Sequence, residues 1–170
     1  MLKINSILND SVKILSNYYI KTPKLDAEIL LSSVLKKSIK EIIFDDKINI
    51  NQKQLKLYKN LVTRRKYGEP VAYILNKKEF WKYNFYVDRN VLIPRPDTEI
   101  IIEETLKLLS KDEKKSVLDI GTGSGCIIIS LFKERSKLYG SAIDISKKAI
   151  KVAKINAKIH QLKNRINFYN

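Results

Sequence analysis

The stretch Val117–Cys126, VLDIGTGSGC, places three glycines two residues apart, directly after an apolar run that contains an acid. Glycine-rich turns after a strand let a ligand approach the backbone closely, because residues without a Cβ turn tightly and expose their N–H groups. The dinucleotide fingerprint needs its third glycine where this chain has Cys126, and no Gly-Lys-Ser/Thr follows as in a P-loop. The stretch therefore predicts a ligand-binding turn of another kind.

Two acids indicate which ligand this turn would bind. Asp119 precedes the glycines and would repel a phosphate. Asp144 ends an expected second strand, Leu138–Asp144, about 20 residues after the first glycine, where an acid can accept hydrogen bonds from both hydroxyls of a ribose. An ammonium, a close backbone approach and a ribose together match S-adenosylmethionine, which has no phosphate. Alternatively, both acids only cap turns. The predicted cofactor site comprises Asp119, Gly121, Thr122, Gly123, Ser124, Gly125 and Asp144.

A second stretch, Glu79–Glu104, contains the element Pro-Arg-Pro-Asp-Thr-Glu at Pro94–Glu99. With this element and the glycine turn, the chain resembles the release factor glutamine methyltransferases of the PrmC/HemK family. The resemblance also includes LDAEILL at 25–31 and RRKYGEPVAYI at 64–74, so it covers essentially the whole chain. The Pro94–Glu99 element is the most specific part, because generic methyltransferases share the glycine turn but lack this element.

The resemblance implies methyl transfer from S-adenosylmethionine to the side-chain amide nitrogen of the glutamine in the Gly-Gly-Gln motif of class I peptide chain release factors. It implies that the glycine turn holds the methionine end of the cofactor, that Asp144 holds the ribose, and that Asp119 reaches the ammonium directly or through water. It further implies that a set of residues packs against the cofactor and shapes the substrate mouth, namely Pro94, Arg95, Pro96, Asp97, Thr98 and Glu99.

The Asn-Pro-Pro-Tyr motif with which the family holds the glutamine amide does not occur in this sequence. We therefore assign no catalytic residue within the chain and expect it to be a C-terminally truncated and inactive version of the family. Two other functions remain open: a methyltransferase that acts on nucleic acid, and a non-catalytic basic interaction protein.

Composition indicates an intracellular protein. The chain has 170 residues, 44% of them hydrophobic, which suffices for one domain or two small ones. No apolar run is long enough to cross a membrane, and the N-terminal residues lack the apolar core of a signal peptide. The single cysteine, Cys126, cannot form an internal disulfide and is expected to be a small buried residue. The prediction is a cytoplasmic monomer with no membrane partner and no metal site.

The net charge of +15 raises the question of an anionic partner. Residues 1–75 carry an excess of seven basic residues and residues 76–170 an excess of eight, so the charge is interpreted as evenly spread and as a coding bias. On this interpretation no direct binding of nucleic acid is required. The alternative is a positive field that steers the protein toward an RNA-containing or acidic partner.

Periodicity divides the chain into three parts and predicts an α/β protein. Residues 1–75 form a helical substrate-recognition domain, with helix caps at Thr22 and Asn51 and with Arg64 and Arg65 near a helix C-terminus, either on a solvated face or in contact with substrate. Residues 76–93 form a β-hairpin linker around a polar break at 82–84. Residues 94–170 form the first half of a Rossmann-like class I methyltransferase sheet, with a helix capped by Asp97 or Thr98, then helices 126–134 and 147–162, and a third strand from Ile166.

Overall fold

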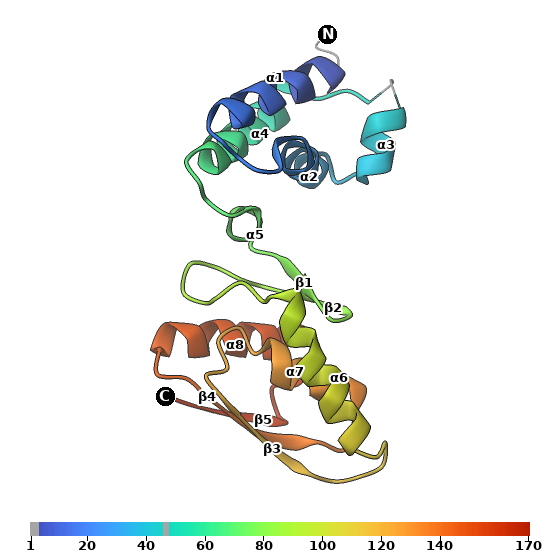
Figure 1. Cartoon of the computed structure of the whole chain (residues 1–170), viewed down its shortest axis with the longest axis vertical. Helices are drawn as coiled ribbons and strands as arrows, with labels where there is room; N and C mark the ends of the chain where they lie inside the picture. Colours follow the sequence, from blue (N-terminus) through green and yellow to red (C-terminus); the bar gives the residue numbers. More distant parts are fainter. Residues whose placement is uncertain (1–3, 46–47) are drawn as a thin grey trace. The chain divides into compact units, whose positions relative to one another are not determined.

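The computed structural model describes residues 4–45 and 48–170 and divides into two compact units, Met1–Leu75 and Asn76–Asn170. Figure 1 shows that the first unit is helical and that the second combines helices with strands. The β-hairpin falls within the second unit.

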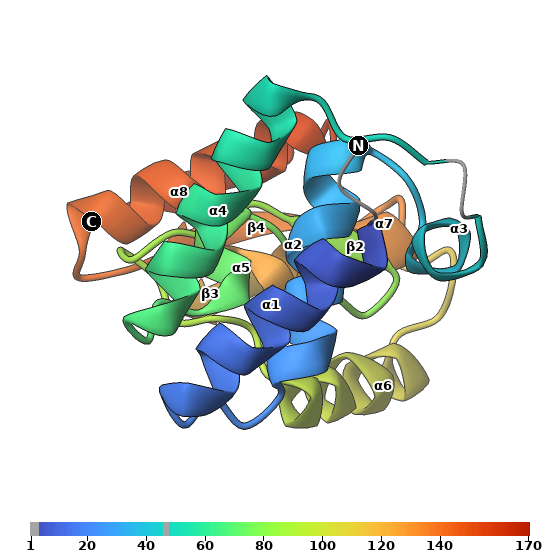
Figure 2. The ribbon, with the colours of Figure 1, turned by 90° about the horizontal axis from the view of Figure 1, so that it is seen from above.

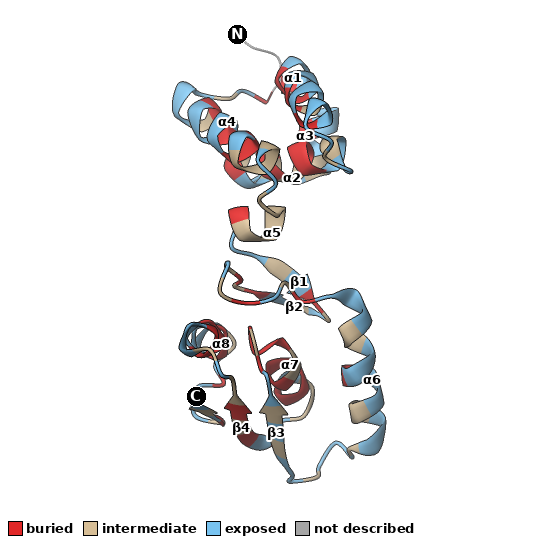
Figure 3. Ribbon diagram, turned by 60° about the vertical axis from the view of Figure 1, so that its left-hand side comes forward, coloured by how far each residue is buried: buried red, intermediate tan, exposed pale blue. Residues whose placement is uncertain are grey.

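The first unit is built from five helices: α1 (Ile4–Asn17), α2 (Pro23–Leu35), α3 (Ile39–Phe44), α4 (Gln52–Lys66) and α5 (Val71–Ile74). Helices α1, α2 and α4 pack against one another, as Figure 2 shows from above. Their inner faces are buried and their outer faces exposed (Figure 3). The centre of this core is formed by fully buried side chains, namely Leu15, Ala27, Leu30, Leu31 and Tyr58.

Both predicted N-cap residues of this unit precede their helices, but only one of them makes a capping hydrogen bond through its side chain. Asn51 caps α4 as predicted, in a capping box with Gln54. Thr22 does precede α2, but its hydroxyl donates to the Asp26 carboxylate at 3.0 Å and makes no bond to the helix backbone. Thr22 is thus the N-cap residue of α2 with Pro23 at the start of the helix, as predicted, but its side chain makes no capping bond because the nearby carboxylate binds the hydroxyl.

Arg64 and Arg65 lie in the last turn of α4, as predicted, and both form ion pairs within the first unit, a role that neither of the two predicted alternatives included. The Arg65 Nε donates to Asp26 at 2.7 Å, and both side chains are largely buried. Arg64 donates two hydrogen bonds to Glu69, at 2.7 and 2.6 Å. These arginines therefore hold α4 to α2 and to the turn after α4.

The second unit begins with the hairpin of β1 (Lys78–Phe80) and β2 (Tyr83–Phe85), which pair antiparallel. Its turn is Trp81–Lys82, with Trp81 at a positive φ of 57°, so the predicted polar break is one residue too late and Asn84 belongs to β2. The Trp81 indole and the Tyr83 hydroxyl both donate to Glu134, at 2.9 and 3.0 Å. Burial, followed by the neighbouring Glu134, raises the pKa of Tyr83 to about 12.

Three parallel strands form the sheet of this unit, in the order β3 (Ser116–Ile120), β4 (Tyr139–Ile143), β5 (Ile166–Tyr169). The crossovers are α7 (Cys126–Glu134) and α8 (Lys147–Ile159), and Figures 1 and 3 show both helices on one side of the sheet. This arrangement confirms the predicted α/β class. Helix α8 ends before the predicted Leu162, because Gln161 adopts a φ of 61°.

The segment Pro96–Thr98 forms a short 3-10 helix, η1, which leads into α6 (Glu99–Leu108). Thr98 is the N-cap residue of α6, one of the two predicted positions, but its side chain makes no capping hydrogen bond. The first residue of α6, Glu99, anchors the helix to the hairpin. Its carboxylate accepts a hydrogen bond from the backbone N–H of Trp81 at 2.7 Å. Among the described residues, no helix has the length and apolar character needed to cross a membrane.

Candidate cofactor site

The glycine turn follows β3, and all three of its glycines have a positive φ, which other residues rarely adopt. A Cβ added to Gly121 would meet open space, and one added to Gly123 would have its nearest neighbour, the Gly121 carbonyl oxygen, at 4.0 Å. A Cβ at Gly125 would instead lie 3.0 Å from Ile129 and 3.4 Å from Ala153. The first two glycines therefore leave the backbone open to a ligand, whereas Gly125 allows α7 and α8 to pack closely.

The turn is fixed against the end of the neighbouring strand. The N–H groups of Gly121 and Thr122 both donate to the Ile143 carbonyl, at 2.8 and 3.0 Å, and the Gly125 N–H donates to the Thr122 carbonyl at 2.8 Å. The site thus lies at the carboxyl ends of β3 and β4, where open α/β sheets bind their ligands.

Asp144 lies beside the turn, as predicted from the sequence spacing. One carboxylate oxygen accepts from the Gly123 N–H at 2.9 Å, and the other accepts from the Ser146 N–H at 2.8 Å. Each oxygen retains a second lone pair, so the carboxylate can hold the turn and still accept from a hydroxyl of a ligand. Both interpretations of Asp144, turn cap and ribose acceptor, are compatible with this geometry.

Asp119 lies under the same turn and accepts a hydrogen bond from the Thr122 hydroxyl at 2.7 Å. Burial raises its pKa above the ordinary value, the bonds from Thr122 and the Ile128 N–H lower it, and the charge of Asp144 raises it. Two carboxylates close enough to interact favour a cationic ligand group over an anionic one.

A phosphate is disfavoured here for a second reason. Phosphate-binding turns present free backbone N–H groups to the ligand. In this turn the N–H groups of Gly121, Thr122, Gly123 and Gly125 all donate to acceptors within the protein. The backbone geometry therefore agrees with the sequence argument against a P-loop or a dinucleotide site.

The remaining members of the predicted site are buried. Thr122 and Ser124 are 5% and 2% exposed, so their side chains support the turn from beneath. Cys126, at the start of α7, is also buried as predicted, and burial raises the pKa of its thiol to about 11. A thiol with this pKa is protonated near neutral pH and is a poor nucleophile.

Asn156 is a site residue that sequence reasoning missed. It is fully buried in α8, and its amide donates to the Ser124 carbonyl at 2.8 Å and to the Tyr86 carbonyl at 2.9 Å. Its side-chain oxygen accepts from the Tyr86 N–H at 2.7 Å. Asn156 therefore joins the glycine turn to the segment that follows the hairpin. The sequence does contain one indication of this role, because Asn156 is the polar residue on the otherwise apolar side of α8.

The residues of the Pro94–Glu99 element differ in exposure. Pro94 is buried, Thr98 and Glu99 are half-buried, and Arg95, Pro96 and Asp97 are exposed. Glu99 anchors the hairpin turn, as described above. The role of this element in shaping a substrate mouth remains a prediction.

His160 lies at the end of α8, where its ring packs 4.9 Å from that of Phe85 and its Nε2 lies 2.9 Å from the Asn84 carbonyl oxygen. Burial lowers its pKa, the bond to Asn84 raises it, and the charge of Lys133 lowers it. Across residues 4–45 and 48–170, no group of three or more His, Cys, Asp or Glu is arranged to hold a metal ion.

Known proteins resemble both units. The PrmC N-terminal domain matches residues 6–75, and a methyltransferase domain matches residues 111–170. The release factor glutamine methyltransferase of Coxiella burnetii is 50% identical over 149 residues, which cover 88% of this chain and 53% of that protein. The enzyme of the same name from Buchnera aphidicola subsp. Schizaphis graminum is 42% identical over 168 residues, covering 99% of this chain and 60% of that protein.

The chain belongs to the release factor glutamine methyltransferase family.

Membership in this family confirms the resemblance carried by the glycine turn and the Pro94–Glu99 element. The chain spans between half and two thirds of the length of the two family members described above. A solved RNA methyltransferase from Salinibacter ruber, in complex with S-adenosyl-L-homocysteine, is 28% identical and covers 45% of this chain and 48% of that chain. Its TM-score of 0.38 is too low to add to the assignment.

Proposed function

We propose that this chain binds S-adenosylmethionine at the glycine turn and forms part of a methyltransferase that modifies the Gly-Gly-Gln glutamine of class I peptide chain release factors. The observation that carries the proposal is the presence of Asp119 and Asp144 beside a turn in which the N–H groups of all three glycines are already bonded within the protein. Such a site suits a ligand with an ammonium and a ribose but no phosphate. The names of the relatives support methylation of a release factor. We place this reaction in the cytoplasm, as expected from the sequence.

Each residue of the site has a defined task in this proposal. S-adenosylmethionine would supply a methyl group on a cationic sulfur. Gly121 and Gly123 leave room for the methionine end to approach the backbone. Asp119 attracts the ammonium, and the free lone pairs of Asp144 accept from the ribose hydroxyls. Asn156 holds the turn in place from α8.

The acceptor is a difficult nucleophile, because the lone pair of a glutamine amide is delocalised. Positioning and electrostatics must therefore align the nitrogen with the methyl group. The sequence lacks the Asn-Pro-Pro-Tyr motif that the family uses for this purpose. We therefore expect residues 1–170 alone to leave a release factor unmethylated. We also propose that Pro94–Glu99 shapes the entrance through which the substrate reaches the cofactor.

A chimera tests the proposal, with residues 1–170 replacing the aligned part of the Coxiella burnetii relative. Calorimetry should detect binding of S-adenosylmethionine and not of NAD. The chimera should methylate a class I release factor and should not methylate the same factor with its Gly-Gly-Gln glutamine changed to alanine.

In the chimera, Asp144→Ala should weaken cofactor binding by about 1 to 3 kcal/mol, the range for a hydrogen bond to a charged group. Unchanged affinity would reduce Asp144 to a turn cap.

The first unit has a separate proposed task, recognition of the release factor. It contributes no residue to the glycine turn, and its core is self-contained. Removing residues 1–75 from the chimera should abolish methylation of the intact release factor and leave cofactor affinity within a few fold. Loss of cofactor binding on this deletion would show that the first unit is part of the cofactor-binding core.

A further inference from the structure

The positive charge of the second unit is concentrated at one end of the sequence. Residues 145–170 contain seven Lys or Arg and no Asp or Glu, whereas residues 76–144 contain twelve basic and eleven acidic residues. The even distribution inferred from the two halves of the chain therefore conceals a local cluster. That cluster consists of α8, β5 and the turn between them.

Four lysines of α8 lie in one row. Their spacings of four, three and four residues place them on the same side of the helix, over a length of about 16 Å. All four are exposed, and none forms an ion pair in the part of the chain that the structure describes. We call this set the lysine row: Lys147, Lys151, Lys154 and Lys158.

The lysine row borders a groove of about 590 Å³ between α8 and β5. Two members of the row, Lys154 and Lys158, line this groove together with Lys163 and the aromatic ring of Phe168. Arg165, the one arginine of the cluster, is engaged elsewhere, because its guanidinium donates to the carbonyls of Phe132, Arg135 and Leu138. The lysines are thus the cations of this cluster that remain available to a partner.

Folding does not explain the lysine row. The opposite side of α8 supplies the buried contacts, through residues such as Val152, Ala153 and Asn156. Like charges four residues apart destabilise a helix slightly, and α8 contains no acid to offset them. A row of unpaired lysines is therefore kept at a small cost to the helix.

We propose that the lysine row and Lys163 form a docking surface for the phosphate backbone of RNA. Protein–protein interfaces are depleted in lysine, whereas lysine is a regular contact for nucleic-acid phosphates. Lysine also acts as a point charge without fixed geometry, so this surface contacts the backbone and reads no bases. A bilayer is a poorer partner, because the apolar face of α8 is buried against the sheet and is not free to insert.

The choice of RNA over DNA rests on the proposed function, since a release factor acts in translation. The binding test is nevertheless independent of that function, because it involves neither the cofactor nor methyl transfer. Failure of RNA binding would leave the methyltransferase proposal intact, and loss of methylation would leave the docking surface intact.

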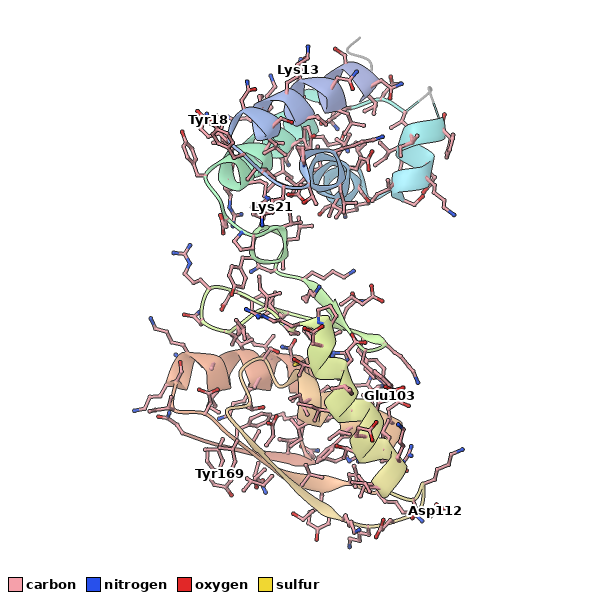
Figure 4. All side chains as sticks on the ribbon, viewed as in Figure 1. Lys13, Tyr18, Lys21, Glu103, Asp112 and Tyr169 are labelled. Carbon is pink, nitrogen blue, oxygen red and sulfur yellow. The ribbon has the colours of Figure 1, made fainter. Side chains whose placement is uncertain are left out.

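The experiment measures fluorescence anisotropy of a labelled oligouridine with the 170-residue chain, over a series of salt concentrations. Reversing the row to glutamate (Lys147→Glu, Lys151→Glu, Lys154→Glu, Lys158→Glu) should weaken binding about tenfold or more and reduce the salt slope by about 3. The matched control reverses four exposed lysines of the first unit and keeps the net charge equal (Lys13→Glu, Lys40→Glu, Lys53→Glu, Lys56→Glu). Lys13 projects from the outer face of α1 (Figure 4). The control should change binding less than threefold.

A second variant guards against misfolding. Changing the same row to glutamine removes the charges without introducing acids in a helix, and circular dichroism should show unchanged helix content. This variant should also weaken RNA binding. Equal weakening by the row and control variants would overturn the proposal, because net charge alone would then explain binding. Polyglutamate that competes as well as unlabelled oligouridine, or tighter binding to DNA of the same sequence, would also overturn it.

Discussion

The side chain of Asn156 makes two hydrogen bonds to the backbone of Tyr86, accepting from its N–H at 2.7 Å and donating to its carbonyl at 2.9 Å. A neighbouring β-strand would bond the N–H and the carbonyl of one residue in the same way. Here the partner is a side chain on a helix, 70 residues further along the chain. Because the same amide also binds the Ser124 carbonyl, the glycine turn and the segment after the hairpin depend on one side chain.

Asn156→Ala should therefore destabilise the second unit by about 1 to 3 kcal/mol, because it removes the partner of a buried bond to Ser124 and of two partly buried bonds to Tyr86. Urea denaturation followed by tryptophan fluorescence measures this loss. Asn156→Asp is the informative companion, since it keeps the acceptor for the Tyr86 N–H and removes both donors. If the alanine variant is as stable as the parent, the amide does not hold the turn.

The glycines of the turn should respond differently to alanine. Gly125→Ala adds a methyl group that meets Ile129 and Ala153, so it should cost about 1 to 3 kcal/mol of overpacking besides the strain of a positive φ. Gly121→Ala carries only the strain, about 1 to 2 kcal/mol. Thermal unfolding ranks the two. Cofactor affinity in the chimera should fall for Gly121→Ala, because the methyl group would occupy the open side of the turn. The opposite stability ranking would contradict the assigned roles.

Arg65→Ala should destabilise the first unit by about 3 kcal/mol, because it leaves the carboxylate of Asp26 buried without its cation. Arg64→Ala is the matched control. Its pair with Glu69 is more exposed, with side chains 38% and 29% accessible, and should contribute about 1 kcal/mol or less. Chemical denaturation followed by far-ultraviolet circular dichroism of both variants makes the comparison. Equal losses would mean that burial does not distinguish the two pairs.

His160 should make the second unit less stable in mild acid. Its folded pKa is lowered, chiefly by burial, so the unfolded chain binds a proton at a higher pH than the folded chain does. The stability contributed by the neutral ring is therefore present above the unfolded pKa and is lost progressively as the pH falls from that value through the lower folded pKa. His160→Gln removes this dependence. Between about pH 7 and pH 5, the melting temperature of the parent should fall more than that of the variant. Parallel profiles would contradict the shift.

Much of the second unit could be predicted from local sequence. The glycine turn, Asp144 and the strand and helix that precede Asp144 follow one another at the spacing of a βαβ unit, so their order determines which residues meet at the sheet edge. Asn51 is a similar case, since its cap involves a partner only three residues away. These features depend on contacts between near neighbours or on a strongly periodic pattern.

Other features depend on contacts that local sequence does not encode. The Thr22 hydroxyl could have bonded the helix backbone or Asp26, and the carboxylate that it binds is itself positioned by Arg65 from another helix. The role of Asn156 depends on Tyr86, which is distant in sequence. The lysine row was missed because the net charge was counted over each half of the chain. That count combines the strongly basic α8 with the nearly neutral segment 76–144.

The bond between Trp81 and Glu134 gives the protein a built-in optical reporter. Trp81 is the single tryptophan of the sequence, and its indole is half-buried where the hairpin meets the end of α7. The first unit contains tyrosines but no tryptophan. Emission excited selectively at the indole band therefore follows the second unit alone, while far-ultraviolet dichroism is weighted toward the helices of the first. One sample thus yields one unfolding curve for the second unit alone and another for the helices of both units, without labels or truncation.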